Sequence, residues 1–328
     1  MANGDSLDAH PVLARHAAKL RALGYQTTEE VQGALASAQE LMARYLDEDL
    51  SAQLPKPAAA YAAAAAHDFP LGVTLDAIPA PTFAFAMAAP TAGPLPASVN
   101  LIPNMPAIRD QAHRGTCVAH AALAALENLR TAGGTFREMS EQFLYFNCKR
   151  NDGIPTAAGT FLGIAVPLLQ RDGCCLETTW PYNPNPVAGN EGQGPPPTNA
   201  VAQATTMRIA SHLQLAPTAV IDFKRELARG RCIAFSIPVF NSWYQNAAVR
   251  SSGDIVLPFP NETVVGGHAM CICGYEDNAA EAAIGGGRFT LRNSWDSAWG
   301  TACRFGVGYG TIPYAYISRF GKEAYSIE

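Results

Sequence analysis

The sequence has little of what marks membrane proteins or nucleic-acid-binding proteins. Its 328 residues contain no run of about 18 strongly apolar residues, the length a helix needs to cross a bilayer. Acidic side chains outnumber basic ones, 28 to 23, and there is no basic stripe, which argues against a nucleic-acid partner. The start, MANGDSLDAHPVLARHAAKL, has no basic stretch followed by an apolar core. We therefore expect no Sec signal peptide, and either a cytoplasmic location or export by another route.

Cysteine is also scarce. Eight cysteines are too few for a disulfide framework in a chain of this length, and no pair of C-x-x-C motifs indicates a structural metal site. Cys271 and Cys273 flank one isoleucine in a strand-like run. Alternation along a strand would place both on one face as small buried hydrophobes, so we predict no metal site.

What is present begins with a predicted helical region, residues 1–50. The first helix pattern, in HPVLARHAAKLRALG, carries apolar residues at helical spacing and stops at Gly24, a residue type that favours the backbone of a helix end. The second begins at Thr27, which fits a capping box with Glu30, and its apolar spacing continues to Leu46.

Two regions of different character follow. Residues 51–95 are rich in alanine and proline, and repeated proline prevents a continuous helix or central strand, so we predict a linker or an extended strap. The run Phe83–Met87 is too apolar to be well solvated, and we expect it to pack into a groove. Residues 96–328 mix helix and strand patterns, which predicts a globular α+β domain.

One cysteine stands where a nucleophile would be expected. In RDQAHRGTCVAHAALAALENL, Cys117 opens an Ala/Leu helix pattern, and the positive end of a helix dipole favours the thiolate. Gly115 permits close approach of the backbone to a ligand. Gln111 supplies an amide that can donate to an oxyanion alongside the N–H of Cys117. Taken alone, a cysteine such as Cys117 is more often a small core residue at a helix start than a nucleophile.

A cysteine nucleophile needs a basic partner and a group that orients this partner. We select His268 from the seven histidines because it follows two glycines at the start of an apolar strand pattern, HAMCICGYE. Asn293 lies in LRNSWDSAWG, and its amide oxygen can accept the ring N–H. Trp295 beside it would shield that hydrogen bond from water.

Together these three segments resemble the papain family of cysteine peptidases. DQAHRGTC corresponds to the family's Q-x5-C block, GGHAMCICGY to its H-A-[VLM]-x-x-x-G-Y block, and RNSWDSAWG to its N-S-W-G-x-x-W-G block. The order of cysteine, histidine and asparagine is the family's order, and His268 follows Cys117 by 151 positions (268 − 117). The resemblance covers about residues 95 to 328.

The resemblance implies a two-lobed α+β fold, with a helical lobe built on the Cys117 helix and a β-barrel-like lobe carrying His268 and Asn293. An extended peptide or protein substrate would lie in the cleft between the lobes. The residues expected to line the cleft by their backbone are Gly159, Thr160 and Gly267.

The resemblance also implies a mechanism, that of a cysteine endopeptidase. Cys117 as thiolate, paired with the imidazolium of His268, would attack the scissile carbonyl while Gln111 and the N–H of Cys117 hold the oxyanion. Such chemistry requires neither a metal nor an organic cofactor. Two alternatives stay open: a catalytically silent binding protein on the same fold, and a transpeptidase or amidase that uses the same triad.

Departures from the family pattern mark a divergent, bacterial-type member. Arg114 replaces a disulfide cysteine, so that bridge cannot form, and Asp296 replaces the first glycine of the asparagine block. EDNAAEAAIGGGR predicts an extended hairpin between the histidine and asparagine blocks. Cys148 could pair with Cys174 or Cys175 as in another family disulfide, or all three could be free thiols.

The N-terminal region stands where the family carries an inhibitory prosegment. We predict that the helical pair docks on the catalytic domain and that the strap around Phe83–Met87 runs near the cleft, so that residues 1–95 act as an intramolecular inhibitor. The alternative is an extension that binds another partner and never touches the site.

Overall fold

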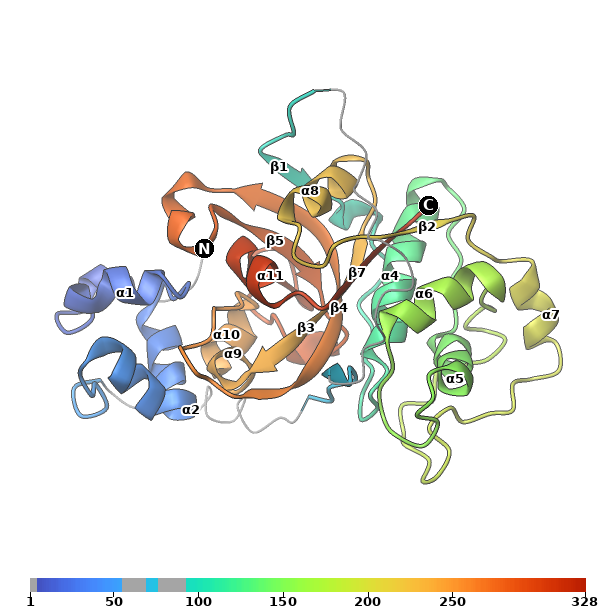
Figure 1. Ribbon diagram of the computed structural model, residues 1–328, viewed down its shortest axis with the longest axis horizontal. Helices are drawn as coiled ribbons and strands as arrows, with labels where there is room; N and C mark the ends of the chain where they lie inside the picture. The colour runs from blue at the N-terminus through green and yellow to red at the C-terminus, as the bar shows by residue number, and fades with distance from the viewer. Residues whose placement is uncertain (1–4, 55–68, 76–92) are drawn as a thin grey trace.

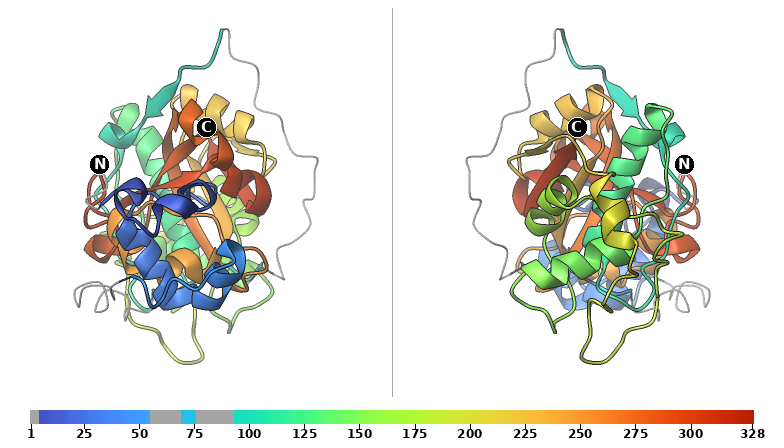
Figure 2. Two further views of the ribbon diagram at one scale, coloured as in Figure 1. Left: turned by 90° about the vertical axis from the view of Figure 1, so that its left-hand side faces the viewer. Right: turned by 90° about the vertical axis from the view of Figure 1, so that its right-hand side faces the viewer.

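The computed structural model describes residues 5–54, 69–75 and 93–328 (Figures 1 and 2). A helical lobe and a sheet lobe lie side by side, and the N-terminal helices pack on the side of the sheet lobe away from the helical lobe (Figure 1). One cluster of buried apolar side chains joins the sheet to the helical lobe, and a second fills the opposite face of the sheet and reaches the N-terminal helices. The predicted two-lobed α+β fold is therefore confirmed.

The sheet lobe is built on antiparallel strands in the order β2-β7-β3-β4-β5-β6, with β1 pairing on β4. Along the long strand β4, Cys271 and Cys273 belong to the cluster facing the helical lobe, whereas Ile272 belongs to the other cluster. The prediction that both cysteines lie buried on one face is thus correct. The strands are β1 (Ser98–Asn100), β2 (His212–Gln214), β3 (Ile233–Phe240), β4 (Val264–Asp277), β5 (Gly287–Arg292), β6 (Tyr309–Pro313) and β7 (Glu323–Ile327).

The β4–β5 connection is the extended hairpin that the sequence predicts, and the 3-10 helix η5 (Ala279–Ile284) lies in it. Other short helices cover the sheet lobe: α8 (Val220–Ala228), α9 (Asn241–Tyr244), α10 (Ala247–Ser252) and α11 (Tyr314–Phe320). All eight cysteines are free, including the three that could have formed a family-type disulfide.

The helical lobe is organised around α4 (Cys117–Ala132), whose alanines and leucines are buried along its first three turns. Small side chains allow the helix to pack closely against β3 and β4 on one side and against the other helices on the other. The remaining helices are α5 (Glu141–Asn151), α6 (Leu162–Arg171) and α7 (Ala200–Thr205).

The N-terminal region contains the predicted helix start and a first helix that is shorter than predicted. In α2 (Thr28–Leu46) the capping box is complete, since Glu30 N–H donates to Thr27 Oγ1 at 3.3 Å and Thr27 N–H donates to the Glu30 carboxylate at 3.1 Å. The first pattern instead breaks into 3-10 turns, with α1 limited to Ala17–Arg21 before Gly24 takes a left-handed backbone.

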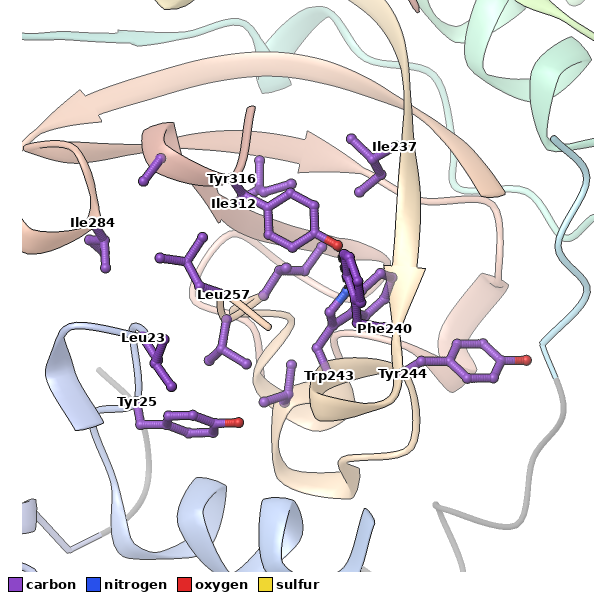
Figure 3. Close-up of a cluster of buried hydrophobic side chains, with 14 of the residues drawn as sticks. Leu23, Tyr25, Ile237, Phe240, Trp243, Tyr244, Leu257, Ile284, Ile312 and Tyr316 are labelled. Atoms are coloured by element: carbon purple, nitrogen blue, oxygen red, sulfur yellow. Dashed lines mark hydrogen bonds between the residues drawn. The ribbon is translucent and has the colours of Figure 1, made fainter. Parts of the chain in front are cut away.

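This region is docked on the sheet lobe by backbone and side-chain contacts. The N–H of Leu257 donates to the carbonyl of Leu23 at 2.7 Å, and the amide of Asn246 donates to the carbonyl of Glu30 at 2.8 Å. Leu23 and Tyr25 project toward the buried cluster of the sheet lobe (Figure 3). The position of residues 5–54 is therefore determined by the fold of the rest of the chain.

Candidate active site

Cys117 is the first residue of α4 and is completely buried. Its sulfur lies at the interface of the two lobes, because the N–H of Ala269 on β4 donates to Sγ at 3.4 Å. Ala269 follows His268 directly, so the predicted base and the predicted nucleophile meet where α4 packs on β4. The helix start also directs its partial positive charge at this sulfur.

His268 and Asn293 form the predicted hydrogen bond. His268 Nε2 lies 2.8 Å from Asn293 Oδ1, and the same oxygen accepts the N–H of Ser294 at 2.8 Å. Because Oδ1 can only accept, the hydrogen of the neutral imidazole resides on Nε2, and Nδ1 keeps its lone pair. Nδ1 is buried and has no hydrogen-bond partner among the described residues. The ring is therefore in the tautomer that can take a proton at Nδ1.

Trp295 covers this pair. Its ring stacks on His268, with 4.4 Å between the ring centroids and 23° between the planes. Trp243 and Trp299 contact Trp295 in turn, with 6.3 Å and 6.2 Å between ring centroids. These neighbours fix the indole against the ring of His268, the position from which the predicted shielding of the His268–Asn293 bond would act.

Gln111 is held so that its amide donates toward the cleft. Ser294 Oγ donates to Gln111 Oε1 at 2.7 Å, which leaves Nε2 to donate to the carbonyls of Arg114 at 2.8 Å and Pro70 at 3.1 Å. The carbonyl of Pro70 therefore takes the hydrogen bond that Gln111 would donate to the carbonyl of a substrate.

Pro70 belongs to residues 69–75, a segment of the predicted strap that crosses the cleft over Cys117. The N–H groups of Gly72 and Val73 donate to the carbonyl of Gly267 at 3.2 and 3.0 Å. The N–H of Thr160 donates to the carbonyl of Gly72 at 3.0 Å. Val73 bridges Thr160 in parallel and Gly267 in antiparallel orientation, so the segment connects both walls of the cleft. The predicted run Phe83–Met87 lies outside the described residues.

Under this cover, Cys117 and His268 are both neutral at neutral pH. Burial raises the pKa of the Cys117 thiol to about 12, and N–H groups that point at the sulfur offset this only in part. Burial lowers the pKa of His268 to about 4 despite its bond to Asn293. The thiolate–imidazolium pair expected from the sequence therefore belongs to a conformation in which water reaches the site.

The predicted cleft-lining residues are placed differently from one another. Thr160 and Gly267 offer their backbone to the segment in the cleft. Gly159 also faces the segment, since a β carbon there would lie 2.7 Å from the carbonyl oxygen of Gly72, but its polar groups turn inward. Its N–H donates to the hydroxyl of Tyr145 at 3.0 Å, and its carbonyl accepts from Lys149 Nζ at 2.7 Å. Sequence reasoning missed Tyr145 and Lys149, which come from α5 and fix this wall of the cleft.

Arg114 occupies the place of the missing disulfide. Its guanidinium lies over the rings of Tyr145 and Tyr182, at 5.2 and 5.3 Å. It donates to Gln142 Oε1, to the carbonyl of Asn183 and to the carbonyl of Glu191, at 2.7 to 2.9 Å. A buried cation with three acceptors thus ties the Cys117 loop to α5 and to the 183–193 loop.

The described residues contain no group of three or more His, Cys, Asp or Glu side chains arranged to hold a metal ion. In the same part of the chain, no helix is both long and apolar enough to cross a bilayer.

Comparison with known proteins bears on the family and the fold. A family described as papain family cysteine protease matches residues 95–314. An uncharacterized peptidase C1-like protein of Acanthamoeba polyphaga mimivirus is 28% identical over 220 residues, which cover 64% of this chain and 65% of the viral protein. The match thus spans less than two thirds of the length of that relative.

Solved structures show the same fold. Xylellain, a cysteine protease from Xylella fastidiosa, is 28% identical with a TM-score of 0.62 and covers 72% of this chain and 87% of its own. ProCathepsin B from Trypanosoma congolense, at 18% identity and a TM-score of 0.57, covers 82% of this chain and 89% of its own. The predicted papain-like fold is therefore confirmed.

Proposed function

The chain belongs to the papain family of cysteine proteases, and we propose that it is an endopeptidase made in an inhibited form, with Cys117, His268 and Asn293 as its catalytic triad. The observation that carries the proposal is that Asn293 Oδ1 accepts two hydrogen bonds, one from the N–H of Ser294 and one from Nε2 of His268. This arrangement fixes the tautomer of His268 that leaves Nδ1 as the base.

With these residues in these roles, the proposed reaction has the following steps. His268 Nδ1 takes the proton of the Cys117 thiol, and the thiolate attacks the scissile carbonyl carbon. The oxyanion is held by the N–H of Cys117 and by Gln111 Nε2. When the C–N bond breaks, the imidazolium gives its proton to the leaving amine. His268 then deprotonates a water molecule, which attacks the thioester, and the acid product leaves with the thiol restored.

Inhibition by the N-terminal region is supported by the contacts of residues 69–75. The carbonyl of Pro70 accepts the hydrogen bond that Gln111 Nε2 would otherwise donate to the oxyanion. Gly72 lies against the sulfur of Cys117. The helical pair in residues 5–54, which precedes this segment in the chain, is itself docked on the sheet lobe. Accordingly we propose that residues 1–95 are an intramolecular inhibitor and that a peptide or protein is the substrate once they leave the cleft.

Two other functions are less well supported. A silent binding protein would not need the donor of Gln111, the tautomer of His268 and the cover of Trp295 together. A transpeptidase would use the same thioester but let an amine attack it instead of water, so product analysis with an added amine separates it. An amidase would hydrolyse the thioester with water and differ in which amide bond it cleaves.

An epoxysuccinyl warhead tests the proposal on the full chain. We expect a mass addition on Cys117 that His268→Ala abolishes, and hydrolysis of peptide substrates after the segment is unseated by Gly72→Val. Absence of an adduct on both the native chain and the Gly72→Val chain, each verified as folded, would reject the peptidase function. Hydrolysis without a gain in the Gly72→Val chain would reject the inhibitory role alone.

A further inference from the structure

Phe69 fills a slot on the sheet lobe beside the proposed catalytic pair. Its side chain is 5% exposed, and its ring stacks on Trp295 with 4.4 Å between the centroids and 10° between the planes. The guanidinium carbon of Arg250 lies over the same ring, 4.3 Å from its centroid. Since the indole covers one face of the ring, the guanidinium covers the other. The Tyr244 hydroxyl donates to the Phe69 carbonyl.

The slot is built from residues that the rest of the fold holds in place. Trp295 is fixed by two further tryptophans, as described above, and contacts Tyr244 edge-on at 6.1 Å. Arg250 lies on α10 and is 2% exposed with Phe69 in place. The N–H of Gly300 donates to its carbonyl at 2.7 Å, which ties α10 to the loop after Trp299. Both walls of the slot are therefore expected to persist when residues 69–75 leave.

The position of the slot relative to His268 identifies which part of a substrate would enter it. In the proposed reaction His268 protonates the leaving amine, so the residue that carries this amine must lie beside the imidazole. Trp295 stacks on that imidazole. Val73, four residues after Phe69 along the segment, pairs instead with Thr160 and Gly267 on the two walls of the cleft. The slot is thus on the leaving-group side.

We propose that this slot takes an aromatic side chain of the residue directly after the scissile bond, and that Arg250 is the specificity-determining residue. The inference rests on the proposed peptidase function. An aromatic ring gains stacking on Trp295 and a cation–π contact with Arg250 at the same time. The side chain that fills the slot in this chain is itself an uncharged aromatic ring, which favours an aromatic ligand over a carboxylate.

Interception of the thioester by added amines tests this slot separately from the acylation step. The enzyme is the full chain carrying Gly72→Val to unseat the segment and Phe69→Ala to empty the slot. It is acylated with a small peptide ester, and the amides of phenylalanine, alanine and aspartate compete with water. We expect phenylalanine amide to be transferred about three- to tenfold more efficiently than alanine amide, the range of one good cation–π contact.

Arg250→Met in the same chain should reduce that preference, measured as the ratio of phenylalanine amide to alanine amide transferred, to less than about twofold. Arg319→Met, an exposed arginine on α11, is the matched control and should leave the preference intact. Arg250→Lys keeps the charge without the planar group, and it should lower the preference even if Arg250→Met does not fold.

Four results would overturn the assignment. If ester hydrolysis occurs but the phenylalanine and alanine amides are transferred equally, the slot does not select an aromatic side chain. If both Arg250 variants retain the preference, Arg250 does not determine it. A preference for aspartate amide that Arg250→Met abolishes would replace the aromatic ligand with an acidic one. Absence of any thioester would overturn the proposed peptidase function, and the slot with it.

Discussion

Gly72 lies directly against the sulfur of Cys117. A β carbon at Gly72 would stand 2.9 Å from Sγ and 2.3 Å from the carbonyl oxygen of Gly115, closer than non-bonded atoms approach. No side chain therefore fits at this position while the segment 69–75 crosses the cleft. The glycine is required by the close approach itself, and it offers a way to remove the cover without shortening the chain.

Gly72→Val should expel the segment from the cleft. We expect the rate of epoxysuccinyl labelling of Cys117 to rise by about tenfold or more, because the clash exceeds what a few hydrogen bonds worth about 1 kcal/mol each can offset. Labelling is measured by intact mass against time. Gly93→Val is the control in the same region, since a β carbon there meets nothing within 4 Å. An unchanged labelling rate in Gly72→Val would mean that the segment does not limit access to Cys117.

The covered conformation should also open in acid. Burial lowers the pKa of His268 from 6.5 to about 4, so the covered state binds this proton less readily than an open state in which His268 has its ordinary pKa and Cys117 is still a thiol. The stability of the cover is thus complete above pH 6.5 and is lost as the pH falls toward 4. Opening directly to the thiolate–imidazolium pair takes up no proton, because His268 then receives its proton from Cys117. Linkage for this single group predicts about a 20-fold rise in the open population between pH 7 and pH 5.

The labelling rate of the native chain divided by that of the Gly72→Val chain measures this effect, because the open chain corrects for the intrinsic pH dependence of the thiol. A ratio that stays constant from pH 7 to pH 5 would show that His268 does not couple protonation to opening. A ratio that falls in acid would show that another group dominates with the opposite sign.

The parts of the site that depend on local sequence are the parts that sequence reasoning predicted. The start of α4 at Cys117, the capping box of Thr27 and the bond from His268 to Asn293 each follow from a short motif and its helix or strand. The occupant of the cleft does not follow in this way. Phe-Pro-Leu-Gly-Val-Thr-Leu has no periodicity of its own, and its place is set by partners such as Gln111, distant in the sequence.

The same reason explains Gly159 and Arg114. Whether a glycine backbone faces the cleft or the interior depends on what lies behind it, and here Tyr145 and Lys149 of α5 bind Gly159 from behind. The sequence predicts that the family disulfide cannot form with Arg114 in place of the cysteine. It does not predict what Arg114 binds, because two of its three acceptors are carbonyls of a loop about 70 residues further along the chain.

Gln111→Glu should separate the role of the donor from the shape of the side chain. Glutamate has nearly the same size but its carboxylate cannot donate to an oxyanion. In the Gly72→Val chain we expect kcat to fall by about 10²- to 10³-fold with a smaller change in KM. Ser294→Ala loses only the bond that orients Gln111, so its loss should be smaller. An unchanged kcat in Gln111→Glu would exclude Gln111 from the oxyanion site.

Arg114→Met should reveal how much stability the buried cation supplies in place of a disulfide. The thioether keeps much of the length and the contact with the two tyrosine rings, but it leaves Gln142 Oε1 and the carbonyls of Asn183 and Glu191 without their donor. Loss of three hydrogen bonds from one buried, charged donor should lower the free energy of unfolding by about 2–4 kcal/mol, measured by urea denaturation. Arg137→Met, an exposed arginine, should change it by less than about 0.5 kcal/mol. If Arg114→Met were as stable as the Arg137 control, the three bonds would contribute specificity of the loop conformation rather than stability.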